Sequence, residues 1–164
     1  MNKNISKLTI MGMLLALALI MSYIETLIPM PLPVPAMKLG LPNLIIVLIL
    51  YKFGAGYAIL INVMRIIISG FAFGGLSAVL FSLSGAAFSF LAMLLLKKLN
   101  IFSISGVSIA GGVFHNAGQL LVATLMVKTS QVVYFIPPLM VMGCITGLAI
   151  GFAASAMLHY INRF

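Results

Sequence analysis

Residues 8–28 read LTIMGMLLALALIMSYIETLI, an apolar run in which Glu25 is the one charged residue. A helix needs about 20 consecutive apolar residues to cross the hydrocarbon core of a bilayer, so this run predicts a membrane-spanning helix. A cleaved signal peptide is the alternative for an apolar run that follows Lys3 and Lys7. The apolar part of such a peptide is only about 7–15 residues long, so we expect a retained first helix that enters from the cytoplasm.

The whole chain has the composition of a membrane protein. Of its 164 residues, 63% are hydrophobic and 6% are charged, and the mean hydropathy is +1.29. A soluble domain carries about 25% charged residues. The outside of this protein must therefore be apolar as well as its core, and lipid is the solvent that permits this. We expect one all-α integral membrane domain over residues 1–164, with six transmembrane helices at about 8–28, 42–53, 57–73, 76–96, 107–127 and 134–160.

The second of these helices, 42–53, is shorter than a bilayer is thick. Its residues cover only about 18 Å at a rise of ~1.5 Å per residue, against a hydrocarbon core of about 30 Å. Either residues from Met37 onward extend the helix, or the protein is locally thin.

The first loop is rich in proline, at Pro29, Pro31, Pro33, Pro35 and Pro42. Proline at every second position removes amide donors and favours polyproline II, so no helix runs through this segment. Two uses remain open for the loop from Pro29 to Asn43. It is either a lid over a cavity or a segment that simply packs at the membrane interface.

The charges are strongly biased toward one sign, with nine Lys and Arg against a single acid and a net charge of +8. The basic residues occur singly or in pairs between apolar runs, which is typical of cytoplasmic loops and not of a nucleic-acid-binding patch. The outer segments hold only Lys38 and Lys128. With both termini in the cytoplasm, the inner segments hold Lys3, Lys7, Lys52, Lys97, Lys98 and Arg163. We therefore expect cytoplasmic N and C termini.

Arg65 is a charged residue in the middle of an expected span. A charge at that depth costs about 2.5–3.5 kcal/mol on insertion scales, so its side chain normally faces protein or a cavity. Asn62 and Ser69 share its helix face. Two roles remain open for Arg65: a structural pair with Glu25, or a planar fork of donors that binds an anionic or carbonyl-bearing ligand.

The helix at 107–127 carries a second polar group, His115, Asn116 and Gln119. Three polar side chains in one membrane span need partners in protein or water. They lie at about the same depth as Arg65, so we expect them to line the same site, with a purely structural role as the alternative. Metal binding is not expected, because no second histidine or carboxylate is spaced with His115.

Two helices carry small residues at a four-residue spacing. Gly143, Gly147 and Gly151 form a flat groove on the last helix, which favours close packing against another helix. Gly12 and Ala16 form a shorter version on the first helix. The last helix is expected to pack internally, whereas the first is a candidate docking face for a partner protein.

The residue types that are absent exclude whole classes of enzyme. The chain has no Asp and one Glu, so it has no carboxylate cluster for Mg²⁺ and no pair of acid/base carboxylates. No Gly-x-x-x-x-Gly-Lys-Ser/Thr stretch exists for nucleotide hydrolysis. We expect no catalysis by this chain alone and no cofactor, so energy for any transport must come from a partner or an ion gradient.

Three stretches together resemble a known family. They are Leu39-Gly40-Leu41-Pro42-Asn43-Leu44, Arg65, and His115-Asn116-x-x-Gln119-Leu120. They resemble the Gx transporter family, often labelled heptaprenyl diphosphate synthase component I, which is similar to the substrate-binding S components of energy-coupling-factor (ECF) transporters. The resemblance covers nearly the whole chain.

The S-component resemblance implies a six-helix bundle in the bacterial cytoplasmic membrane that captures a small vitamin- or cofactor-related molecule. It also implies docking through Gly12 and Ala16 to a membrane scaffold that carries paired ATPase subunits. The expected substrate-binding residues are Glu25, Asn43, Asn62, Arg65, His115, Asn116 and Gln119.

The alternative is a non-transporting membrane scaffold or accessory subunit for isoprenoid, quinone or redox enzymes. In that case the buried polar residues would hold helices together, and the small-residue faces would bind partners. The synthase label does not make the chain a synthase, because prenyl chain elongation needs acidic clusters that hold diphosphate-bound Mg²⁺.

Overall fold

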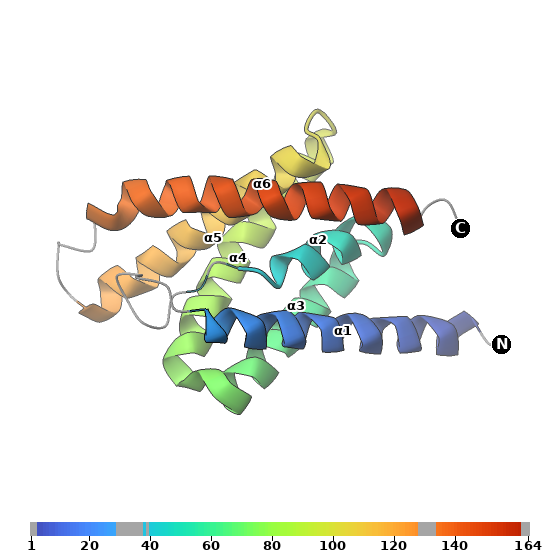
Figure 1. The fold of residues 1–164 in the computed structure, drawn as a ribbon, viewed down its shortest axis with the longest axis horizontal. Helices are drawn as coiled ribbons and strands as arrows, with labels where there is room; N and C mark the ends of the chain where they lie inside the picture. Colours follow the sequence, from blue (N-terminus) through green and yellow to red (C-terminus); the bar gives the residue numbers. More distant parts are fainter. Residues whose placement is uncertain (1–2, 29–37, 39, 128–133, 162–164) are drawn as a thin grey trace.

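The computed structural model describes residues 3–28, 38, 40–127 and 134–161, and all regular structure within them is helical (Figure 1). The helices are α1 (Lys3–Leu27), α2 (Asn43–Lys52), α3 (Ala55–Ser69), the π-helical turn η1 (Gly70–Gly74), α4 (Gly75–Leu99), α5 (Ile104–Val127) and α6 (Ile136–Ile161). The expected all-α class is confirmed.

Four stretches of the described chain are long and apolar enough to cross a membrane: Ile5–Leu27, Ala55–Leu99, Ile104–Met126 and Ile136–Ile161. Large apolar side chains cover their exposed surfaces, as expected where lipid is the solvent. The protein is therefore a multi-pass helical membrane protein in contact with lipid.

The prediction of six membrane-spanning helices is not supported, because α2 is too short to be one. It has 10 residues, which cover only about 15 Å, and it begins at Asn43. Residues 45–50 are all buried, so α2 lies inside the protein. A helix that is apolar all round is typical of a fully buried helix as well as of a span. The proposed extension from Met37 lies outside the described residues.

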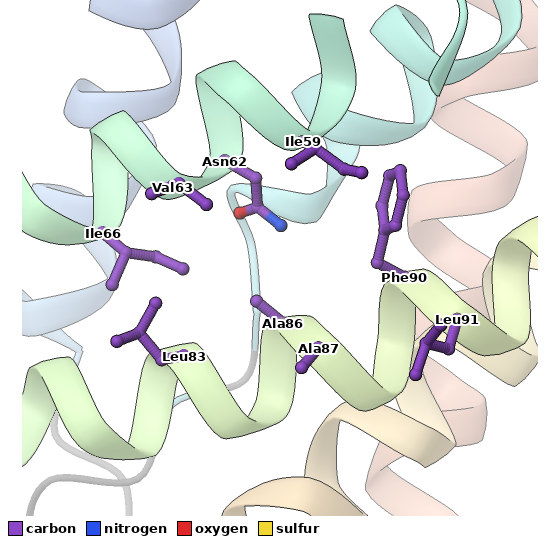
Figure 2. A pocket seen from close by; sticks show the side chains of 9 residues that line it. All are labelled: Ile59, Asn62, Val63, Ile66, Leu83, Ala86, Ala87, Phe90 and Leu91. Atoms are coloured by element: carbon purple, nitrogen blue, oxygen red, sulfur yellow. The ribbon is translucent and has the colours of Figure 1, made fainter. Parts of the chain in front are cut away.

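The stretch Ala55–Leu99 is not one straight helix, because the chain reverses at η1. Gly75 has φ +77°, a left-handed conformation that favours glycine. Gly70 lies directly against the side chain of Val79, where a side chain at position 70 would overlap it. After this reversal α4 runs back beside α3 (Figures 1 and 2).

The tight packing of α5 against α6 depends on glycine. A Cβ atom on Gly147 would lie 2.7 Å from the Ser108 carbonyl oxygen, and one on Gly151 would lie 2.5 Å from the Cα of Ser105. Gly143 packs in the same way on Gly112. The backbones of the two helices are thus in direct contact along this row, the arrangement that small residues allow in a membrane.

Helix α1 lies at one side of the bundle, where it contacts α3 and α2 (Figure 1). Met11 and Ala18 face the protein and are buried, whereas Gly12 and Ala16 are exposed. A Cβ atom on Gly12 would meet nothing within 4 Å. Gly12 and Ala16 therefore lie on a face of α1 that no described part of this chain covers.

Two lysine side chains, Lys7 and Lys97, lie at one end of the bundle. Lys7 Nζ lies 4.3 Å from the centre of the Tyr57 ring. Lys97 Nζ donates to the Leu50 carbonyl oxygen at 2.5 Å and lies 4.7 Å from the centre of the Tyr51 ring. The first turn of α1 and the last turn of α6 lie at this same end (Figure 1). Lys128 and Arg163 fall outside the described residues.

Candidate functional site

The interior of this membrane protein contains an unusual number of polar side chains. The buried ones are Ser22, Glu25, Asn43, Asn62, Arg65, Ser69, Ser82, Ser89, Ser108, His115, Asn116 and Gln119. Buried polar groups in a membrane need hydrogen-bond partners, so the partners that these residues have, or lack, show what the cluster does.

Arg65 is held by α1 and by its own helix. Its Nε donates to Asn62 Oδ1 at 3.0 Å, and its Nη1 donates weakly to Ser22 Oγ at 3.5 Å. The residue is 2% exposed, and its Nη2 has no hydrogen-bond partner among the described residues. One arm of the buried guanidinium therefore remains available to a ligand.

Glu25 binds backbone rather than Arg65. Its Oε1 accepts hydrogen bonds from Gly40 N at 2.5 Å and Leu41 N at 3.1 Å, while its buried Oε2 has no partner in the described chain. Glu25 and Arg65 attract each other electrostatically but form no ion pair. The expected structural pairing of Arg65 with Glu25 is therefore an electrostatic attraction without a direct hydrogen bond between the two side chains. The carboxylate instead anchors the chain just before α2.

His115 and Gln119 anchor the same segment from α5. The Nε2 atoms of the two side chains lie 2.9 Å apart, and Gln119 Oε1 accepts from Lys38 N at 3.1 Å. Since Gln119 uses its oxygen for Lys38, its amide nitrogen donates to His115 Nε2. This network places the histidine proton on Nδ1. The structure thus brings Glu25, His115 and Gln119 together around one backbone segment.

Gly40 explains why this segment carries the sequence Leu-Gly-Leu-Pro-Asn. Its φ is +88°, and a Cβ atom there would lie 2.8 Å from Asn43 Nδ2 and 3.3 Å from His115 Cδ2. Only glycine combines that backbone conformation with so close an approach. Asn43, one of the expected binding residues, and His115 therefore both lie close to Gly40.

Asn116 points elsewhere. Its Nδ2 donates to the Leu139 carbonyl oxygen of α6 at 2.6 Å. Four of the seven expected site residues, Glu25, Asn43, His115 and Gln119, thus surround the segment before α2. Asn62 and Arg65 form a second group, whose charge acts on Glu25 and His115, and Asn116 links α5 to α6. Two further residues, Ser22 and Lys38, belong to the cluster and were not predicted. The spacing of Ser22 from Glu25, three residues along one helix, was the available signal.

The cluster has an excess of positive charge, because Arg65 and Lys38 flank a single carboxylate. Burial lowers the pKa of Lys38 below its ordinary value; Glu25 opposes this effect, and Arg65 adds to it. Lys38 Nζ lies 6.0 Å from the centre of the Phe73 ring, near η1. The arrangement favours an anionic ligand.

The depressed pKa of Lys38 predicts a pH effect on stability. Below that pKa the ammonium is charged in both the folded and the unfolded chain, and only the folded state bears the cost of burying it. As pH rises through the lowered pKa toward the ordinary value, this cost disappears and stability increases. We expect Lys38→Met to raise the melting temperature at pH 7 by about 2 °C. The gain should shrink toward pH 10.

The measurement is thermal unfolding of the ligand-free protein in detergent at both pH values. Lys98→Met, at an exposed position, is the matched control and should show no such convergence. A melting temperature for Lys38→Met that falls below the unsubstituted protein at pH 7 would contradict the argument.

Fold and site together define the class as a multi-pass helical membrane protein with a buried, net-positive polar centre. Residues 14–157 match the family described as heptaprenyl diphosphate synthase component I. The chain belongs to this family, which confirms the family resemblance found in the sequence. No curated protein matches the chain. No solved structure matches it either.

Proposed function

We propose that this protein is a substrate-binding membrane subunit that captures a small anionic molecule for uptake. The observation that carries the proposal is the buried guanidinium of Arg65, whose Nη2 has no partner in the described chain. An unsatisfied buried donor costs about 1–3 kcal/mol, more when it is charged, so a ligand that pairs with it recovers that energy. The planar fork of arginine suits a carboxylate or phosphate group.

The segment of Lys38, Gly40 and Leu41 is the described part of the proposed lid. It is tied to α1 through Glu25 and to α5 through Gln119. Release of a few hydrogen bonds would lift it from His115 and Arg65. The rest of the loop from Pro29 onward lies outside the described residues, so the lid as a whole belongs to this proposal.

The proposed arrangement is a single domain in a bacterial cytoplasmic membrane, with both termini cytoplasmic. The described lysines at the end that holds the first turn of α1 support this orientation, because cytoplasmic ends carry an excess of Lys and Arg. In an S-component-like bundle α3 and α4 would each cross the membrane separately. The buried helix α2 would be the sixth helix of the bundle. The site would then open outward.

The proposed subunit performs no catalysis, so the energy for uptake comes from partner proteins. The exposed Gly12 and Ala16 on α1 would dock to an ECF-type membrane scaffold with its ATPase subunits. Small residues let a partner helix approach the α1 backbone closely.

Native mass spectrometry of protein purified from its own membranes tests the proposed site. We expect a bound anionic small molecule on the unsubstituted chain. Arg65→Gln should weaken its retention by about tenfold or more, because it removes the charged fork. His115→Ala should weaken it less, through loss of contact with Gly40. Lys98→Ala, far from the cluster, is the control. Unchanged retention in both site variants would show that the proposed site is wrong.

A second candidate function is a non-transporting membrane subunit of a prenyl diphosphate synthase. The family description favours it, since a component I implies a partner component II. The exposed small-residue face of α1 would then bind that partner. Co-purification separates the two: recovery of ATPase subunits favours uptake, and recovery of a prenyl synthase favours the accessory role.

A further inference from the structure

A groove of about 340 Å³ lies between α3 and α4 (Figure 2). Five of its lining residues are exposed on the outer surface of the bundle, so the groove opens sideways, toward lipid. Eight of its nine lining residues are apolar. The lining consists of Ile59, Asn62, Val63, Ile66, Leu83, Ala86, Ala87, Phe90 and Leu91.

The one polar residue of the groove is Asn62, which is 4% exposed. Its Oδ1 accepts the hydrogen bond from Arg65 Nε. Its Nδ2 has no hydrogen-bond partner in residues 3–28, 38, 40–127 and 134–161, and Figure 2 shows the amide pointing from α3 toward α4. The amide donor of a buried residue thus faces an apolar groove, where lipid chains offer no acceptor and the oxygen of a ligand would supply one.

Asn62 also connects the groove with the polar cluster. On one side its oxygen binds the guanidinium of Arg65, and on the other its nitrogen faces the groove. Arg65 does not itself line the groove, so Asn62 is the link between the two. A molecule whose polar end binds Asn62 beside Arg65 would have its remaining atoms between α3 and α4, against the side chains of Val63, Ile66 and Leu83.

We infer that the ligand is a single-chain anionic amphiphile whose apolar tail lies in the groove and which enters sideways from the membrane. This inference rests on the proposed function of the Arg65 site and names its substrate class. A plain hydrocarbon chain would leave the Asn62 donor unpaired, whereas an oxygen-bearing head would pair with it. The groove volume is near the lower end of the roughly 300–1,000 Å³ typical of small-molecule sites, which suits one chain rather than two.

The tail adds little affinity, because lipid around the protein is as apolar as the groove. Its role is access: a membrane-soluble molecule reaches the site without crossing water. The groove must therefore be unobstructed for a tailed ligand, whereas a head group without a tail does not need it.

The test uses two probes with the protein in lipid nanodiscs. One is dodecyl phosphate with a photoreactive diazirine in its tail, and the other is inorganic phosphate, measured by equilibrium dialysis. Illumination should label the segments 59–66 and 83–91, and unlabelled dodecyl phosphate should compete. Ala87→Phe fills the groove and should reduce this labelling by about tenfold, because its ring occupies the space that the tail needs. Phosphate binding should not change.

Ala149→Phe, on the exposed surface of α6, is the matched control and should label like the unsubstituted chain. Labelling spread evenly over the lipid-facing helices would overturn the inference. A second result would also overturn it: Ala87→Phe leaves dodecyl phosphate binding intact, while Arg65→Gln abolishes the binding of both probes. In that case the inference fails, and the proposed function of the Arg65 site survives. If neither probe binds the unsubstituted chain, the anion site itself is wrong, and the inference fails with it.

Discussion

Gly112→Val is expected to separate α5 from α6 and to lower the free energy of unfolding by more than about 3 kcal/mol. The Cα of Gly112 lies directly against the Gly143 carbonyl, and a Cβ atom at position 112 would overlap the Gly143 backbone. Gly147 Cα lies on the same side. Both obstacles are backbone atoms, so no side chain can rotate away to relieve the overlap, and α6 as a whole must move.

Thermal unfolding in detergent measures this effect, and Gly12→Val is its matched control. Both positions lie within long helices, so the change in helix propensity is the same. A Cβ atom on Gly12 meets nothing within 4 Å. We expect the Gly112 variant to melt roughly 10 °C lower and the Gly12 variant within about 2 °C of the unsubstituted protein. Equal melting temperatures for the two variants would contradict the packing argument.

The membrane class of this protein could be predicted because it depends on composition. A chain that is 63% hydrophobic has no other solvent than lipid. The prediction that α2 spans the membrane failed for the same reason, because it too rested on composition. NLIIVLILYK has the same apolar pattern whether lipid or protein surrounds it, and only its 10-residue length distinguishes the two. When a helix is apolar all round, the periodicity of its sequence does not show which of its faces contacts protein and which contacts lipid.

The candidate site could be predicted where its residues share one helix. Arg65 and Asn62 are three residues apart, and His115 and Gln119 are four apart, so each pair meets on a helix face. Contacts between helices could not be predicted this way. Asn116 binds Leu139 of α6, and Glu25 binds the backbone of Gly40. Both contacts depend on how the helices pack, which the spacing within one helix does not show.

The groove between α3 and α4 was not predicted, although its residues were visible in the sequence. It exists because the chain reverses at η1 and brings Asn62 opposite Ala86 and Ala87. Small side chains on α4 leave space that larger ones would fill. No spacing within either helix shows that the two faces oppose each other.

Glu25→Ala is expected to cost about 3 kcal/mol or more of stability, because two backbone N–H groups lose their acceptor and each unsatisfied buried group costs about 1–3 kcal/mol. Two effects combine. The backbone N–H groups of Gly40 and Leu41 lose their shared acceptor, and the cations Arg65 and Lys38 lose the one carboxylate near them. Glu25→Gln keeps an acceptor for both N–H groups, so it should cost less than half as much.

A double-mutant cycle in mixed detergent micelles separates these effects. Unfolding is induced by titration with SDS. Glu25→Ala combined with Arg65→Ala should cost less than the sum of the single variants, since removing both charges leaves neither uncompensated in the apolar interior. Thr26→Ala, at an exposed position whose hydroxyl binds only its own helix, is the control for changes in α1. Strict additivity of the two single variants would show that the Glu25 charge does not compensate Arg65. Glu25 would then serve only as an acceptor for the segment before α2, and the net charge of the site would no longer argue for an anionic ligand.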